Sequence, residues 1–374
     1  MSTPVVIPPI DLAPRTRSLD PAAFTEPTSR DEEWKFSALN RLKQFFTADA
    51  NAGCVTATGN GVVMLPIADV ASTWIPTDVT AAVARAHVSD AGVLEIPAQD
   101  VIADPVVIDL TTTTAKAYQH LEIVAGHFSS ATVIIRQNLT SDVNGSTVIT
   151  VGDGAKLTVI TVIEGANSTA LALQLPVTLG RDAHFTGALA AIGGGAVRIQ
   201  NSVTYAAPGG TAELFGVFLA DEGQHIEQRI FVHHDQPHCK SDVMYKGALL
   251  SSGARSVWIG DVLVRKEAIG TDTHQVNRNL LLSQGARADS VPNLELETGE
   301  IIKAGHASAT GRFDDEQVFY LQSRGIPLEA ARQLVVRGFF AEVLGRIGNE
   351  AWRDELLTKI SQRLGINTFE GDDE

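Results

Sequence analysis

The chain has 374 residues, of which 44% are hydrophobic and 20% charged, which is typical of globular proteins and argues against wholesale disorder. The net charge of −15 argues against a nucleic-acid partner, since binding to the phosphate backbone needs clustered Lys and Arg. The two cysteines, Cys54 and Cys239, cannot form a disulfide framework and suit a reducing compartment. Because we find neither a secretory pattern nor an apolar run of roughly 20 residues, we expect a cytoplasmic protein without a membrane partner.

Two segments precede the main body of the chain. Residues 1–28 are rich in proline and poor in large apolar side chains, so we expect a flexible arm. Residues 29–105 are predicted to form an α+β subdomain. We expect it to open with a helix capped by Ser29, with Glu32 at capping-box spacing. A strand at residues 62–65 and a helix at residues 80–89 should follow.

Residues 106–312 carry short β-branched strands separated by tight turns. Five turns resemble one another and place Ala155, Ala183, Thr211, Ala254 and Ala286 at steps of 28, 28, 43 and 32 residues. A quasi-period of this size indicates stacked repeats, and strands without intervening helices favour a parallel β-helix. An antiparallel sandwich also fits short strands, and the irregular period leaves that alternative open.

Residues 313–374 are predicted to form a helical subdomain. We expect one helix from Asp314 to the Arg324-Gly325 pair, a second at Leu328–Leu344 and a third at residues 349–364. The second helix should place one set of apolar side chains on a single side: Leu334, Val335, Phe339, Val343 and Leu344. Such helices after a β domain either cap the strand stack or dock a partner.

Residues 231–306 contain five of the ten histidines and are the main candidate region for chemistry. Because successive strand residues point to opposite faces, His233 and His234 cannot both ligate one ion, and His238 and Cys239 share this restriction. A metal site made by this segment alone is therefore disfavoured. We expect His306 at a junction between a strand and a loop. Phosphate-binding loops, zincin motifs and nucleophile elbows are absent from the sequence.

Five motifs lie between residues 237 and 327. They are Pro-His-Cys-Lys-Ser at 237–241, Tyr-Lys-Gly-Ala-Leu at 245–249, Thr-Asp-Thr-His-Gln-Val-Asn-Arg-Asn-Leu-Leu-Leu-Ser at 271–283, Ala-Asp-Ser-Val-Pro-Asn-Leu-Glu at 288–295 and Phe-Asp-Asp-Glu-Gln-Val-Phe-Tyr-Leu-Gln-Ser-Arg-Gly-Ile-Pro at 313–327. These motifs resemble the SufB/SufD family of iron–sulfur cluster assembly proteins, and within it the SufD branch. The resemblance runs from about residue 106 to residue 344. The chain lacks a cysteine near Ala286, where SufB has one, and has Ala304 where some SufD proteins have a cysteine.

This resemblance implies a right-handed parallel β-helix that acts as a non-catalytic scaffold in a SufBCD complex. It implies pairing with a SufB-like subunit and binding of a SufC-like ATPase through the C-terminal helices. The residues expected to face SufC are Phe319, Tyr320, Arg324, Phe339 and Phe340.

The resemblance also bears on ligands. His306 corresponds to a candidate ligand for iron or a nascent cluster shared with SufB, with His238 and Cys239 as weaker candidates. No cofactor is expected to be permanently bound. Two alternatives remain: a β-helix enzyme acting on polysaccharide, which needs clustered carboxylates, and a homodimeric β-helix binding module.

Overall fold

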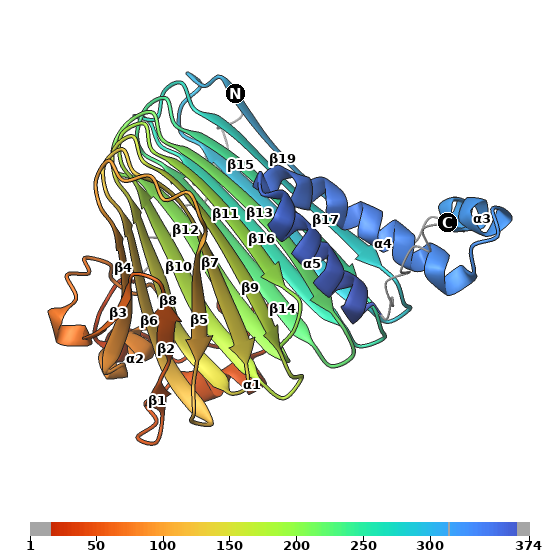
Figure 1. The fold of residues 1–374 in the computed structure, drawn as a ribbon, viewed down its shortest axis with the longest axis horizontal. Coiled ribbons are helices and arrows are strands. Elements are labelled where there is room, and N and C mark those ends of the chain that lie inside the picture. Colours follow the sequence, from red (N-terminus) through yellow and green to blue (C-terminus); the bar gives the residue numbers. More distant parts are fainter. Residues whose placement is uncertain (1–15, 313–314, 365–374) are drawn as a thin grey trace, which may run out of the picture.

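The computed structural model describes residues 16–312 and 315–364 and shows a long parallel β-solenoid with helices at its flanks (Figure 1). The strands alternate along the chain between two sheets, and all pairs are parallel except β2–β5 and β3–β4. The predicted parallel β-helix is therefore confirmed, and the antiparallel sandwich is wrong.

The ten-stranded sheet, sheet A, follows the order β18 (Arg287–Leu296), β16 (Arg255–Val264), β14 (His225–His234), β12 (Ala196–Tyr205), β10 (Ala170–Leu179), β8 (Asp142–Val151), β6 (Lys116–Ala125), β4 (Asp90–Ile96) and β3 (Val62–Pro66), with β1 (Gly53–Cys54) paired to β6. The nine-stranded sheet, sheet B, follows the order β19 (Lys303–Arg312), β17 (Asp272–Leu281), β15 (Lys240–Leu249), β13 (Thr211–Ala220), β11 (His184–Ala191), β9 (Lys156–Gly165), β7 (Ser130–Leu139), β5 (Val106–Thr111) and β2 (Thr56–Gly59).

The repeat becomes regular once strands of one sheet are compared. The first residues of β9, β11, β13, β15, β17 and β19 pair in register, and they lie 28, 27, 29, 32 and 31 residues apart. The irregular period from the sequence arose because Ala155 and Ala183 precede strands of sheet B, whereas Ala254 and Ala286 precede strands of sheet A. The turn motif occurs at both edges of each coil, so the step of 43 residues joined two different edges.

The space between the two sheets, here called the lumen, is filled by alternate side chains of every strand. In β10 these are Leu171, Leu173, Leu175, Val177 and Leu179, all buried in one apolar cluster that runs along the solenoid. Stacking the coils thus buries a continuous core, although a single coil could not bury its own apolar face.

The N-terminal segment differs from its prediction. Ser29 does not cap a helix, because residues 29–36 form turns, and only the short helix α1 (Leu39–Leu42) and the 3₁₀ turn η2 (Lys43–Phe45) follow. Two further 3₁₀ turns are η1 (Pro21–Ala23) and η3 (Ile67–Asp69). Helix α2 (Val79–His87) confirms the predicted helix, and Asp78 caps it by accepting a hydrogen bond from the backbone N–H of Ala81.

Buried charges hold this segment against sheet A. The Arg198 guanidinium, 2% exposed on β12, lies 2.9 Å from Asp78, 3.5 Å from Glu33 and 3.3 Å from Glu227. The Trp34 ring covers it with a centroid distance of 3.8 Å. Because a buried guanidinium needs compensating charge and hydrogen bonds, these contacts fix the N-terminal segment in one place on the solenoid.

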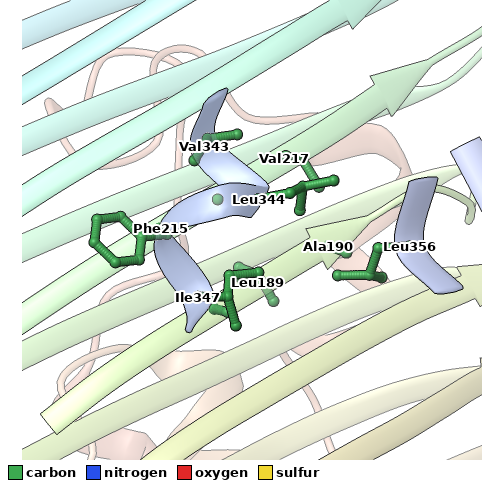
Figure 2. Close-up of a pocket in the computed structure, with 10 residues that line it drawn as sticks. Leu189, Ala190, Phe215, Val217, Val343, Leu344, Ile347 and Leu356 are labelled. Carbon is green, nitrogen blue, oxygen red and sulfur yellow. The ribbon is translucent and has the colours of Figure 1, made fainter. Parts of the chain in front are cut away.

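The C-terminal helices are α3 (Asp315–Ser323), α4 (Leu328–Leu344) and α5 (Glu350–Arg363), with the 3₁₀ turn η4 (Gly345–Ile347) between the last two. Helices α4 and α5 lie across the outer face of sheet B (Figure 1), so they cover a sheet face and do not cap the strand stack. Figure 2 shows the apolar contact: Leu344 and Ile347 point at Leu189, Phe215 and Val217 of β11 and β13. Among the described residues, no helix is long and apolar enough to cross a membrane.

Candidate functional site

The solenoid ends in two strands whose outer edges have no strand partner among the described residues. Strand β19 pairs only with β17, and β18 pairs only with β16. All ten residues of internal strands such as β13 and β16 are buried or half-buried, whereas eight of the ten in β19 are exposed. An exposed strand edge carries free backbone N–H and C=O groups and can therefore pair with another chain.

His306 lies within β19 and is exposed. The expected junction between strand and loop is wrong, because His306 is the fourth residue of a ten-residue strand. Its register partner on β17 is Gln275, a fully buried lumen residue. Since parallel register partners point to the same side of a sheet, the His306 side chain is directed toward the open end of the lumen.

His238 and Cys239 belong to the turn that leads into β15. His238 has a φ of 61° and donates its backbone N–H to the carbonyl of Ile269 in the next coil, while its ring lies against Gly270. Cys239 is fully buried in the lumen cluster, and burial raises the pKa of its thiol. A raised pKa disfavours the thiolate that binds iron. The geometry therefore favours a structural role for both residues, His238 in the turn and Cys239 in the core.

The expected separation of His233 and His234 is confirmed. His234 is buried in the lumen, stacks on Tyr205 and hydrogen-bonds through Nε2 to the Ser241 hydroxyl. Burial lowers the pKa of His234 to about 3, which keeps its ring neutral. His233 lies on the outer face, 3.3 Å from Nε of Arg265. Within the described part of the chain, no group of three or more His, Cys, Asp and Glu could hold a metal ion.

The Tyr-Lys-Gly motif is explained by packing around β15. The Tyr245 ring lies in the lumen against Gly216, and Gly247 leaves room for the Phe218 ring, which a Cβ there would strike at 1.9 Å. Lys246 points outward, where its buried ammonium donates to the Phe339 carbonyl and the Glu342 carboxylate of α4. We did not predict this anchor from the sequence, although a lysine on a strand whose neighbours are apolar is a usable signal.

The five expected partner-facing residues separate into two groups. Phe319 and Tyr320 on α3 are 71% and 57% exposed, and Arg324 lies over the Tyr320 ring. Phe339 is half-buried beneath Lys246. Phe340 is fully buried against sheet B, so its expected role toward a partner is wrong: the face of α4 that packs on the sheet is Val336, Phe340 and Val343.

Helix α3 is therefore the exposed aromatic element of the C-terminal region. Figure 1 shows it beyond the edge of sheet B, next to the start of α4. A helix so placed presents aromatic and cationic side chains, which are enriched where proteins meet other proteins.

Comparison with known proteins agrees with this geometry. Residues 108–339 match the family model for the SufBD core domain of the SUF system of iron–sulfur cluster assembly. The chain belongs to the SufBD family. An iron–sulfur cluster assembly SufBD family protein of Mycobacterium tuberculosis is 42% identical over 365 residues, covering 93% of this chain and 92% of that protein. The resemblance found in the motifs is thereby confirmed.

Two further members carry the name SufD. The iron–sulfur cluster assembly protein SufD of Escherichia coli is 26% identical over 383 residues, covering 90% of this chain and 89% of that protein. SufD of Bacillus subtilis is 29% identical over 258 residues, covering 66% of this chain and 57% of that protein. The SufBD core match begins within β5, covers every later strand including the last two, and extends into α4.

Proposed function

We propose that this SufBD family chain is a non-catalytic, cytoplasmic scaffold subunit for iron–sulfur cluster assembly within a SufBCD complex. The observation that carries the proposal is the open end of the solenoid, where β18 and β19 leave free strand edges and His306 is exposed. A SufB-like solenoid would pair with these edges, and its ligands would join His306 around iron or a nascent cluster. Iron and cluster are cargo in this proposal and are not held permanently.

Helix α3 is proposed as the contact for a SufC-like ATPase, because it presents Phe319, Tyr320 and Arg324 away from the solenoid. Phe339 at the edge of the α4–sheet contact could extend that surface, whereas Phe340 could not. His238 and Cys239 would act as ligands only if the turn before β15 opens, since the Cys239 thiol is buried.

Co-expression with tagged SufB-like and SufC-like subunits tests the complex directly. We expect one stable assembly that contains all three chains, with the isolated chain forming at most a homodimer through the same strand edges. Sedimentation with and without the SufB-like subunit distinguishes the two states. A chain that co-purifies with neither subunit and remains a homodimer would instead support the homodimeric binding module.

Replacing His306 with alanine is expected to lower cluster assembly without changing the fold. The side chain is exposed on an edge strand, so its removal leaves no cavity and the free energy of unfolding should change by less than about 0.5 kcal/mol. Iron and acid-labile sulfide retained by the co-expressed complex are the measurement. Unchanged iron and sulfide in the variant complex would show that His306 has no ligand role; the control is His127→Ala, another exposed histidine far along the solenoid.

Replacing Phe319 with aspartate is expected to weaken binding of the SufC-like subunit by about tenfold or more, because burying a carboxylate in an aromatic contact is costly. The unfolding transition should stay unchanged, since Phe319 is 71% exposed. Isothermal titration with the purified ATPase gives the affinity. Leu19→Asp, also at an exposed apolar side chain but in the N-terminal segment, is the matched control. Equal affinities for both variants and the wild type would exclude α3 as the contact.

A further inference from the structure

The lumen changes character along the solenoid. In β10 its residues are aliphatic, whereas in β17 the same face carries Thr273, Gln275, Asn277 and Asn279, all at most 4% exposed. These residues come from the Thr-Asp-x-His-Gln-x-Asn-x-Asn stretch. Polar side chains in a core need hydrogen-bond partners, so the last coils require an explanation that the aliphatic coils do not.

Several buried polar atoms in this region have no hydrogen-bond partner. They include Nε2 of Gln228, Nε1 of Trp258, Oε1 of Gln275 and Oδ1 of Asn279, and also Nδ1 of His234. The two acceptors are fixed by the other end of each amide: Gln275 Nε2 donates to the Asn293 carbonyl, and Asn279 Nδ2 donates to Asn277 Oδ1. Turning either amide over would break those hydrogen bonds, so the unpaired oxygens are set by the structure.

The first four of these residues belong to one connected set of polar lumen side chains, here called the column, in which Asn279 lies four residues along β17 from Gln275. Gln228 and Trp258 are register partners on β14 and β16, and the Trp258 ring and the Gln275 amide meet over Gly260. Ser290 on β18 continues the column by donating to Asn277 Oδ1, and Thr310 on β19 accepts from Asn279. Ser290 is half-buried and Thr310 is exposed, so the column reaches solvent at the open end of the solenoid.

The side chains that line the lumen determine what kind of ligand could bind there. Alternation along β14, β15, β16 and β17 places no Lys, Arg, Asp or Glu at their lumen-facing positions, so a bare ion would find no compensating charge there. The unpaired atoms include donors and acceptors together, which suits a small neutral molecule that both donates and accepts. Buried water commonly fills this role, with about three hydrogen bonds to groups that are otherwise unpaired.

We propose that the last coils of the solenoid hold a file of water molecules, bound by Gln228, Trp258, Gln275 and Asn279 and entering between β18 and β19. This site is separate from the proposed role of His306 and needs no partner chain. A partner that covers the open end would seal it.

The Trp258 indole N–H is a direct probe of this file. In the ¹⁵N-labelled chain, we expect a cross-peak between this proton and a bound water. We also expect the indole proton to exchange with deuterium at a rate that does not change with urea concentration below the unfolding transition. Trp258→Phe assigns the signal. An indole that exchanges only through global unfolding and has no cross-peak to water would overturn the proposal.

A plug at the open end tests the route of entry. Ser308 shares the lumen-facing side of β19 with Thr310, whereas Ala309 between them faces outward, and both residues are exposed. Ser308→Trp should slow exchange of the Trp258 indole by about tenfold or more, and Ala309→Trp should leave it unchanged. Similar exchange rates in the two variants would refute entry between the last strands.

Discussion

Replacing Phe340 with alanine is expected to lower the free energy of unfolding by about 3–5 kcal/mol, the usual cost of removing a fully buried phenylalanine ring. Phe340 is 0% exposed and lies with Val336, Val343 and Leu344 against the outer face of sheet B. Its ring meets Phe339 edge-on with centroids 5.3 Å apart. The cavity left by alanine would remove contacts on both the helix and the sheet.

Urea unfolding followed by tryptophan fluorescence measures this effect, and Trp352 on α5, one of the four tryptophans, is buried in the same apolar cluster. Leu334→Ala on the same helix is the matched control, since Leu334 is 45% exposed and its removal should cost less than about 0.5 kcal/mol. Equal midpoints for the two variants would contradict the packing of α4 on the sheet.

The burial of Phe340 shows what helical periodicity could not decide. The sequence located α4 correctly, but apolar residues occur around most of this helix, including Leu334 and Val335 as well as Val336 and Phe340. The sequence predicted one packed side that includes Leu334, Val343 and Leu344. The sheet buries Val343 and Leu344 as predicted, but it also buries Val336 and Phe340 and leaves Leu334 45% exposed. Only the sheet surface, built from residues more than 90 positions earlier, distinguishes the two sides.

The sequence predicted strands and helices well where neighbouring residues alone determine the structure. Alternation separated His233 from His234, and Asn349 caps α5 as a helix start should. The prediction of an N-terminal helix was wrong because Glu33 and Trp34 contact Arg198, a residue about 165 positions away. This tertiary contact outweighs helix propensity.

The candidate site was only partly visible in the sequence. His306 followed from the family resemblance, but its place in an exposed edge strand follows from the register with Gln275. The polar lumen could have been suspected from alternate Gln275, Asn277 and Asn279 in one strand. Which of their atoms lack partners depends on side chains from β14, β16 and β18, and no pattern within β17 contains that information.

Acid is expected to destabilise the solenoid through two buried histidines. Burial lowers the pKa of His234 to about 3 and that of His225 to about 4, from an ordinary value of 6.5. Below pH 6.5 the unfolded chain therefore binds protons that the folded chain does not, so stability is present above pH 6.5 and is lost as pH falls. Each histidine should contribute a slope of about 1.4 kcal/mol per pH unit between pH 6.5 and pH 4.

His234→Phe isolates one of these contributions. The phenyl ring can still stack on Tyr205, and Ser241 keeps its hydrogen bond to Thr273, but the titrating group is gone. The slope of the unfolding free energy against pH should fall by about 1.4 kcal/mol per pH unit relative to the wild type. Groups such as half-buried Asp235, whose pKa is raised and whose effect has the opposite sign, are common to both proteins and cancel in the comparison.

Urea unfolding at half-unit steps from pH 7 to pH 4 gives both slopes. His127→Phe serves as the control, because its side chain is 65% exposed and its replacement should leave the slope unchanged. An unchanged slope in His234→Phe would mean that His234 takes up a proton in the folded chain. Its ring would then have to be accessible to solvent in the lumen, contrary to its burial between Tyr205 and Ser241.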